Sequence, residues 1–186
     1  MSDRPRFPRD QAVAVATQLQ AMISPACERI AIVGSLRRSK DTVGDIELLF
    51  IPRMTTRPDG LFDRETVSVA GEVIDRLVKD RLLDKRTNAK GQFTWGDQNK
   101  LAIHVPSGIP VDLFATTPEK WWVSLVIRTG SKETNLRLTN GAIRHGGQLN
   151  AYGSGVTWKD GSHTAATSEQ HVFELCHILY LEPHQR

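Results

Sequence analysis

Gly34-Ser35-Leu36-Arg37-Arg38 precedes Gly44-Asp45-Ile46-Glu47-Leu48-Leu49-Phe50 by only a few residues. The second of these segments is an apolar run that carries two acids. Successive side chains of a β-strand point to opposite faces, so Asp45 and Glu47 share one face while Ile46 and its apolar neighbours pack behind. The run therefore predicts a buried strand with two carboxylates on its open face.

A third acid, Asp112, lies far downstream within another apolar run, Ile109-Pro110-Val111-Asp112-Leu113-Phe114. Neighbouring carboxylates repel one another, and a fold tolerates them at low cost when cations lie between them. Hard divalent cations such as Mg²⁺ prefer oxygen ligands. Three acids and a glycine–serine turn that can cradle phosphate predict a two-metal site for phosphoryl transfer. We therefore expect a nucleotidyltransferase.

The composition is that of an ordinary globular protein: 186 residues, of which 39% are hydrophobic and 24% are charged. No apolar run is long enough to cross a bilayer, and the N-terminus lacks the apolar core of a signal peptide, so no membrane partner is expected. Cys27 and Cys176 lack the spacing of a metal site. They predict buried, reduced thiols in a cytoplasmic protein.

Basic residues are concentrated between Arg76 and Lys100. This stretch contains seven basic and three acidic residues, while the whole chain carries a net charge of only +3. Such a local excess fits a surface that follows a phosphate backbone, and it equally fits a solvated helix face with a polar turn. The histidines show no mutual spacing typical of metal ligands, so we interpret them as surface or core residues.

Hydrophobic periodicity predicts the order of elements. A helix capped by Asp10 runs to Ile23 and includes Met22 in its apolar stripe. The remaining elements, by residue number, are strands over 29–33 and 45–51, a loop through 58–60, a helix over 63–83, a β-meander over 91–114, a helix that starts at 118 and contains Trp121 and Trp122 as packing residues, a helix over 132–145, a hairpin strand at 156–158 and a helix capped by Ser168 that runs to Tyr180.

These residues resemble DNA polymerase family X, the polymerase β-like nucleotidyltransferases. The resemblance covers nearly the whole chain, and its motifs are Gly34-Ser35-Leu36-Arg37-Arg38, Gly44-Asp45-Ile46-Glu47, Val111-Asp112-Leu113, Thr129-Gly130-Ser131-Lys132-Glu133-Thr134-Asn135, Gln148-Leu149-Asn150-Ala151-Tyr152-Gly153, Ala166-Thr167-Ser168-Glu169 and Val172-Phe173-Glu174. It implies an α+β fold. A palm over residues 1–116, with a mixed β-sheet and helices on one face, would precede a small α+β C-terminal domain over 117–186 that closes over the nucleotide.

The resemblance also implies roles for individual residues. Asp45 and Glu47 would hold two Mg²⁺ ions, for which Mn²⁺ can substitute, and Asp112 would complete the site of the catalytic metal. The groups expected to contact the nucleotide are Ser35, Arg38 and the backbone of Gly44 at the triphosphate, and Ile127, Arg128, Gly130, Ser131 and Asn135 along the sugar and base. Arg37 is equally consistent with a phosphate ligand and with surface charge.

Three features depart from the usual family pattern. The sequence starts at the palm, so we expect neither the helix-hairpin-helix modules nor the lyase module, as in the small form known from some viral members. Ile127-Arg128 replaces two aromatic residues that contact the deoxyribose, which predicts relaxed sugar selection. Glu47 replaces the commoner Asp of the metal pair.

We therefore expect a minimal repair-type DNA polymerase, a monomer that acts on primer-template or gapped DNA with nucleoside triphosphates. Two other functions are open on the sequence alone. A nucleotidyltransferase could modify a small molecule or a protein, because the glycine–serine turn and the Asp-x-Glu pair serve those enzymes too. A DNA-binding accessory protein could retain the fold with a catalytically retired site.

Overall fold

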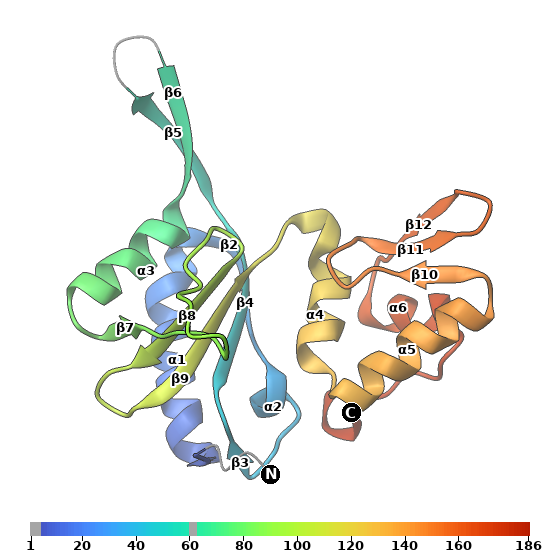
Figure 1. The fold of residues 1–186 in the computed structure, drawn as a ribbon, viewed down its shortest axis with the longest axis horizontal. Helices are drawn as coiled ribbons and strands as arrows, with labels where there is room; N and C mark the ends of the chain where they lie inside the picture. The colour runs from blue at the N-terminus through green and yellow to red at the C-terminus, as the bar shows by residue number, and fades with distance from the viewer. Residues whose placement is uncertain (1–4, 60–62) are drawn as a thin grey trace. The chain divides into compact units, whose positions relative to one another are not determined.

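The computed structural model of the protein describes residues 5–59 and 63–186, and it divides into two compact units (Figure 1). The first unit contains the chain up to Ile32 together with Asp41–Ala115. The second unit contains Val33–Lys40 together with Thr116–Arg186. The glycine–serine segment therefore belongs to the second unit, although both of its flanks belong to the first.

A five-stranded sheet forms the centre of the first unit, in the order β2 (Cys27–Val33), β4 (Ile46–Pro52), β9 (Ile109–Ala115), β8 (Asn99–His104) and β7 (Leu83–Lys85). Strands β4 and β9 are parallel, whereas β9 and β8, and β8 and β7, are antiparallel. The sheet is therefore mixed, as expected. The short strands β1 (Phe7–Pro8) and β3 (Thr42–Val43) form a separate antiparallel pair.

Two helices cover one face of this sheet: α1 (Arg9–Ile23) and α3 (Val69–Lys79) contact each other and both contact β4 (Figure 1). A short 3₁₀ helix, η1 (Ser24–Ala26), follows α1. The expected capping role of Asp10 is wrong, because Pro8 occupies the N-cap and Asp10 lies in the first turn, where its charge favours the helix dipole. Met22 is 41% exposed and lies outside the buried stripe.

The region between Pro52 and Leu83 differs from the expectation. The predicted loop and the first part of the predicted helix form an antiparallel hairpin of β5 (Met54–Asp59) and β6 (Asp63–Ser68), while Gly60 of the predicted loop lies outside the described residues. Helix α3 begins only after Ser68, whose hydroxyl accepts a hydrogen bond from the Gly71 amide and caps the helix. It ends at Lys79, before the left-handed backbone of Arg81.

The second unit combines helices with a small antiparallel sheet. Its elements are α2 (Gly34–Arg37), η2 (Pro118–Lys120), α4 (Trp121–Thr129), α5 (Lys132–Arg144), β10 (Gly147–Leu149), β11 (Gly155–Trp158), β12 (His163–Ala165), α6 (Glu169–Leu175) and η3 (Pro183–Gln185). The strands pair in the order β10-β11-β12. The α+β character of this unit agrees with the expectation.

Packing in the second unit centres on α4, α5 and α6, whose apolar faces share one core with Val156 of β11. Trp121 is 2% exposed, which confirms it as a packing residue. The Ser168 hydroxyl accepts a hydrogen bond from the His171 amide, so the predicted cap of α6 is confirmed. The helix nevertheless ends at Leu175 instead of Tyr180, because the chain turns through a left-handed residue at His177.

Cys27 and Cys176 are free and buried, as expected, and burial raises the pKa of each thiol to about 11. Within residues 5–59 and 63–186, no helix is both long enough and apolar enough to span a bilayer.

Candidate active site

The parallel pairing of β4 with β9 sets Glu47 directly opposite Asp112. Their neighbours Ile46, Leu48, Val111 and Leu113 are at most 1% exposed. Because side chains alternate along a strand, this buried set fixes one face of the sheet, and both carboxylates emerge on the other face, where each is partly exposed. Two acids that are far apart in sequence are thus neighbours.

Asp45 and Gly44 lie immediately before β4 and are both partly exposed. Asp45 precedes Glu47 by two residues, the spacing that keeps side chains on one side of an extended chain. Among residues 5–59 and 63–186, a Cβ atom at Gly44 would approach only the Arg6 guanidinium, at 3.9 Å, so packing against these residues does not demand glycine there.

An arginine that the sequence did not single out is paired with the third acid. A guanidinium nitrogen of Arg86, Nη2, donates a hydrogen bond to Oδ1 of Asp112, and the two side chains are 24% and 16% exposed. The Arg86 amide donates to the Leu101 carbonyl at 3.0 Å, and Leu101 is the register partner of Asp112 on β8. The backbone thus holds Arg86 beside this carboxylate.

The carboxylates suit a hard divalent cation by their oxygen chemistry and by the register that aligns Glu47 with Asp112. Within the described parts of the chain, however, no three acidic, histidine or cysteine side chains are arranged to hold a metal ion. The positive charge at Asp112 comes instead from Arg86. The oxygen chemistry of the acids suits a metal, but their side chains are not gathered into a metal site in the described residues, and a protein cation is bound to one of them.

The glycine–serine turn of the second unit begins with Gly34, whose φ of +65° lies in the left-handed region that glycine adopts without strain. Ser35 follows in the short helix α2. Its hydroxyl oxygen is buried and has no hydrogen-bond partner among the residues that the structure describes. Buried polar groups are usually satisfied, so this hydroxyl is an exception within the described chain.

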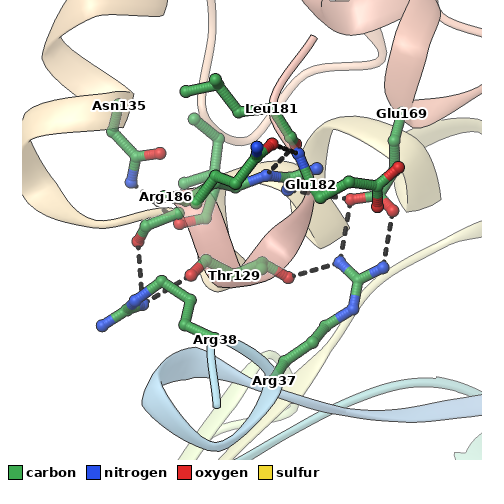
Figure 2. Close-up of polar contacts among 11 residues, drawn as sticks. Arg37, Arg38, Thr129, Asn135, Glu169, Leu181, Glu182 and Arg186 are labelled. Atoms are coloured by element: carbon green, nitrogen blue, oxygen red, sulfur yellow. Dashed lines mark hydrogen bonds and ion pairs between the residues drawn. The ribbon is translucent and has the colours of Figure 1, made fainter. Parts of the chain in front are cut away.

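Arg37 and Arg38 follow in this turn and have different partners (Figure 2). Arg37 binds Glu169 through two hydrogen bonds of 2.8 and 2.6 Å, and it donates to the Thr129 hydroxyl at 2.7 Å. Arg38 donates to the main-chain carbonyls of Thr129, at 2.5 Å, and of Gly130, at 3.3 Å. Arg37 is therefore not a simple surface charge, because its side chain forms an internal ion pair, and its role as a phosphate ligand stays a prediction.

Glu169 also accepts a hydrogen bond from Nη1 of Arg186, at 3.0 Å, so one carboxylate binds two guanidinium groups (Figure 2). Burial alone would raise the pKa of Glu169, but Arg37 and Arg186 outweigh it and the pKa lies below its usual value. The hydrogen bond to Glu169 raises the pKa of Arg37. The sequence identified Glu169 only as the start of a helix, since nothing local indicates partners so distant along the chain.

The segment between α4 and α5 is held by its own polar side chains. The Ser131 hydroxyl accepts a hydrogen bond from the Thr134 amide and caps α5. Asn135 donates to the Ile127 carbonyl at 2.8 Å, while its side-chain oxygen is buried without a hydrogen-bond partner in the described chain. A Cβ atom at Gly130 would lie 2.6 Å from that oxygen, so a larger residue there would require the Asn135 side chain to move.

Ile127 and Arg128, expected near the sugar, both belong to α4 and are partly exposed. Ile127 packs against the hydrophobic core of the second unit. The residues predicted to contact the nucleotide, apart from Gly44, therefore all lie in the second unit, and the three acids lie in the first.

Comparison with known protein families bears on the second unit. Residues 124–186 match the family model of the DNA polymerase beta thumb. The matched part of the chain, which we term the thumb-like region, starts within α4 and extends through α6 to Arg186. It contains Gly130, Ser131, Asn135 and Glu169. The resemblance to polymerase β-like enzymes is thus confirmed for this region. No curated protein matches the chain.

Proposed function

We propose that the protein is a metal-dependent nucleotidyltransferase that extends the 3′-hydroxyl of a DNA primer, a small DNA polymerase. The observation that carries this proposal is the register of Glu47 with Asp112 on parallel strands, which gathers carboxylates in a chain that also has a thumb-like region. The thumb-like region favours nucleic acid as the acceptor over a small molecule or a protein.

In the proposed reaction the primer 3′-hydroxyl gives up its proton to solvent and its oxygen attacks the α-phosphorus of a nucleoside triphosphate, while the bond from that phosphorus to the bridging oxygen breaks and pyrophosphate leaves. Asp45, Glu47 and Asp112 would hold two Mg²⁺ ions, which supply charge neutralisation of the attacking and leaving oxygens when bound. The protein's own contribution is mainly position, because phosphoryl transfer asks little covalent chemistry of an enzyme.

The second unit would bind the triphosphate. The buried Ser35 hydroxyl can donate a hydrogen bond to a phosphate oxygen, which would give it the partner it lacks among the described residues. Arg38 contributes a planar set of donors that matches phosphate oxygens, and in the structure it uses them on the carbonyls of Thr129 and Gly130. The buried oxygen of Asn135 could accept a hydrogen bond from the sugar or base.

Primer extension on gapped, nicked and single-stranded DNA tests the proposal. Glu47→Gln and Asp112→Asn should each abolish extension and leave the circular dichroism spectrum unchanged, because both side chains are partly exposed. Asp84→Asn is the matched control, since Asp84 is an exposed acid on β7 of the same sheet. An Asp112→Asn enzyme with normal turnover would refute the metal role. Labelling of small acceptors without primer extension would favour the alternative transferase, and absence of pyrophosphate release would favour an accessory protein.

A further inference from the structure

The connection between β7 and β8, residues 86–98, is an ordered hairpin on the first unit. It is closed by bridges between Thr87 and Phe93 and between Trp95 and Lys100. The Asn88 side-chain oxygen accepts hydrogen bonds from the amides of Lys90, at 2.9 Å, and Gln92, at 3.2 Å. Any surface that this hairpin presents is therefore already shaped before a ligand arrives.

Trp95 fixes the hairpin to the body of the unit. Its indole nitrogen donates to Oδ1 of Asp75 on α3 at 2.8 Å. The ammonium groups of Lys85 and Lys100 lie 4.7 and 5.3 Å from its ring centroid, within the range of cation–π interactions. Trp95 is consequently engaged within the protein and serves as an anchor.

Phe93 has the opposite character, because its side chain is 67% exposed and stands outside the core. Residues 85–100 carry four basic residues and the single acid Asp97; of the four, Lys100 is 7% exposed and Arg86 is paired with Asp112, which leaves Lys85 and Lys90 as the cations of this surface. Lys85 and Lys90 are exposed. An exposed aromatic ring among cations is the combination that binds unpaired bases and their phosphates.

The hairpin leads directly toward the candidate active site. Its first residue, Arg86, pairs with Asp112, and its last bridge, at Lys100, adjoins the register partner of Asp112, Leu101. We propose that the 86–98 hairpin binds single-stranded nucleic acid, with a base stacked on Phe93 and the neighbouring phosphates on Lys85 and Lys90. This inference rests on the proposed function, in that it names where a strand of the nucleic-acid substrate is held.

The test measures fluorescence anisotropy of labelled oligonucleotides in EDTA, so that binding is separated from catalysis. The ligands are oligo-dT, oligo-U and an abasic oligonucleotide of equal length, which keeps the phosphates and lacks the bases. Wild-type protein should prefer oligo-dT over the abasic strand by about fivefold or more, the lower end of one base–aromatic stack. Oligo-U should behave like oligo-dT, because stacking needs only the base.

Three variants separate stacking from charge. Phe93→Leu should lose the preference for bases and keep the affinity for the abasic strand, whereas Phe93→Tyr, which restores a ring, should keep both. Lys90→Ala should weaken the binding of oligo-dT and of the abasic strand by the same factor, and it should reduce the slope of log affinity against log salt concentration by about one. The exposure of Phe93 means that these substitutions leave the core intact.

A Phe93→Leu variant that retains the wild-type preference would overturn the inference. Tighter binding of an acidic peptide than of any oligonucleotide would overturn it as well, in favour of an acidic protein partner. A different result would show that the proposed function is wrong. In that case Asp112→Asn would leave primer extension unchanged, while the protein in EDTA would still bind oligo-dT more tightly than the abasic strand.

Discussion

Arg86 donates a hydrogen bond to Asp112, the residue that stands opposite Glu47 in the central sheet. A guanidinium group therefore neutralises one of the carboxylates that we assign to metal binding. A divalent ion bound at this carboxylate would lie close to the guanidinium, and the two cations would repel each other. The contact with Arg86 thus opposes occupancy of the site by a metal.

Removal of this competing charge should strengthen divalent-ion binding. We expect Arg86→Gln to lower the dissociation constant for Mn²⁺ by on the order of tenfold, since a unit charge about 4 Å away is worth up to about 4 kcal/mol near a protein surface. Titration followed by electron paramagnetic resonance measures free Mn²⁺ directly. Arg57→Gln is the control, because Arg57 pairs with Glu65 and Glu72 and not with any of the three proposed metal ligands. Weaker binding by Arg86→Gln would show instead that Arg86 positions the carboxylate.

The carboxylate of Glu169 binds two guanidinium groups, so its neutralisation should destabilise the second unit strongly. Glu169→Gln leaves Arg37 and Arg186 without their counter-charge, and loss of one partner of a buried pair costs about 3–5 kcal/mol. The free energy of unfolding, measured in urea, should fall accordingly. Glu65→Gln breaks an ion pair whose side chains are 53% and 52% exposed, and it should cost less than about 1 kcal/mol. Equal effects of the two substitutions would contradict this prediction.

The same carboxylate predicts a dependence of stability on pH. The pKa of Glu169 is lower in the folded protein than its usual value, which is that of the unfolded chain. Its contribution is therefore complete above the unfolded pKa and disappears as the pH falls through the folded pKa. The difference in melting temperature between wild-type protein and Glu169→Gln should be greatest near neutral pH and should shrink in acid. A difference that is constant down to pH 3 would exclude this linkage.

Gly141 in α5 allows a close approach of the chain that follows α6. A Cβ atom there would lie 2.2 Å from the Cys176 carbonyl oxygen and 3.0 Å from the side chain of Ile178. Alanine favours a helix over glycine by about 1 kcal/mol, but the backbone clash should outweigh this gain and make Gly141→Ala destabilising. Asn140→Ala, at the exposed neighbouring position of the same helix, should be neutral or slightly stabilising. The melting temperatures of both variants, measured by thermal unfolding, show whether each substitution stabilises or destabilises the protein.

Selection against ribonucleotides should be relaxed if the proposed activity is correct. Ile127 packs toward the hydrophobic core, and Arg128 is a flexible cation at the end of α4. Neither supplies a rigid ring against a 2′-hydroxyl, and one such contact is worth only a few kcal/mol. The ratio of incorporation efficiencies for dATP and ATP should therefore be far below that of a replicative polymerase. Arg128→Tyr should raise this ratio, while Arg137→Tyr, on an exposed face of α5, should not.

Period-two alternation was enough to predict that Glu47 points away from the buried side chains of Ile46 and Leu48, and the apolar run over 109–114 was enough to predict a strand at Asp112. Local cap chemistry likewise identified Ser168 as the start of α6. The segment from Asp63 to Ser68 was misassigned because its polar residues have no apolar period, and its strand exists only through pairing with β5. The partners of Asp112 and Glu169 were also missed, because ion pairs across 26 and 132 residues leave no mark in local sequence.

Arg37 is synthesised long before Glu169, at a separation of 132 residues. During translation, the early segment Val33–Lys40 must therefore wait until almost the whole chain has emerged before its arginine finds its carboxylate. The last residue of the first unit is Ala115, so all of its residues emerge before those of the second unit's helices α4 to α6. A fragment cut at the boundary of the matched region would retain Glu169 but lose Arg37. Protein engineers who wish to transplant this region should carry residues 33–40 with it, joined by a linker or supplied as a peptide.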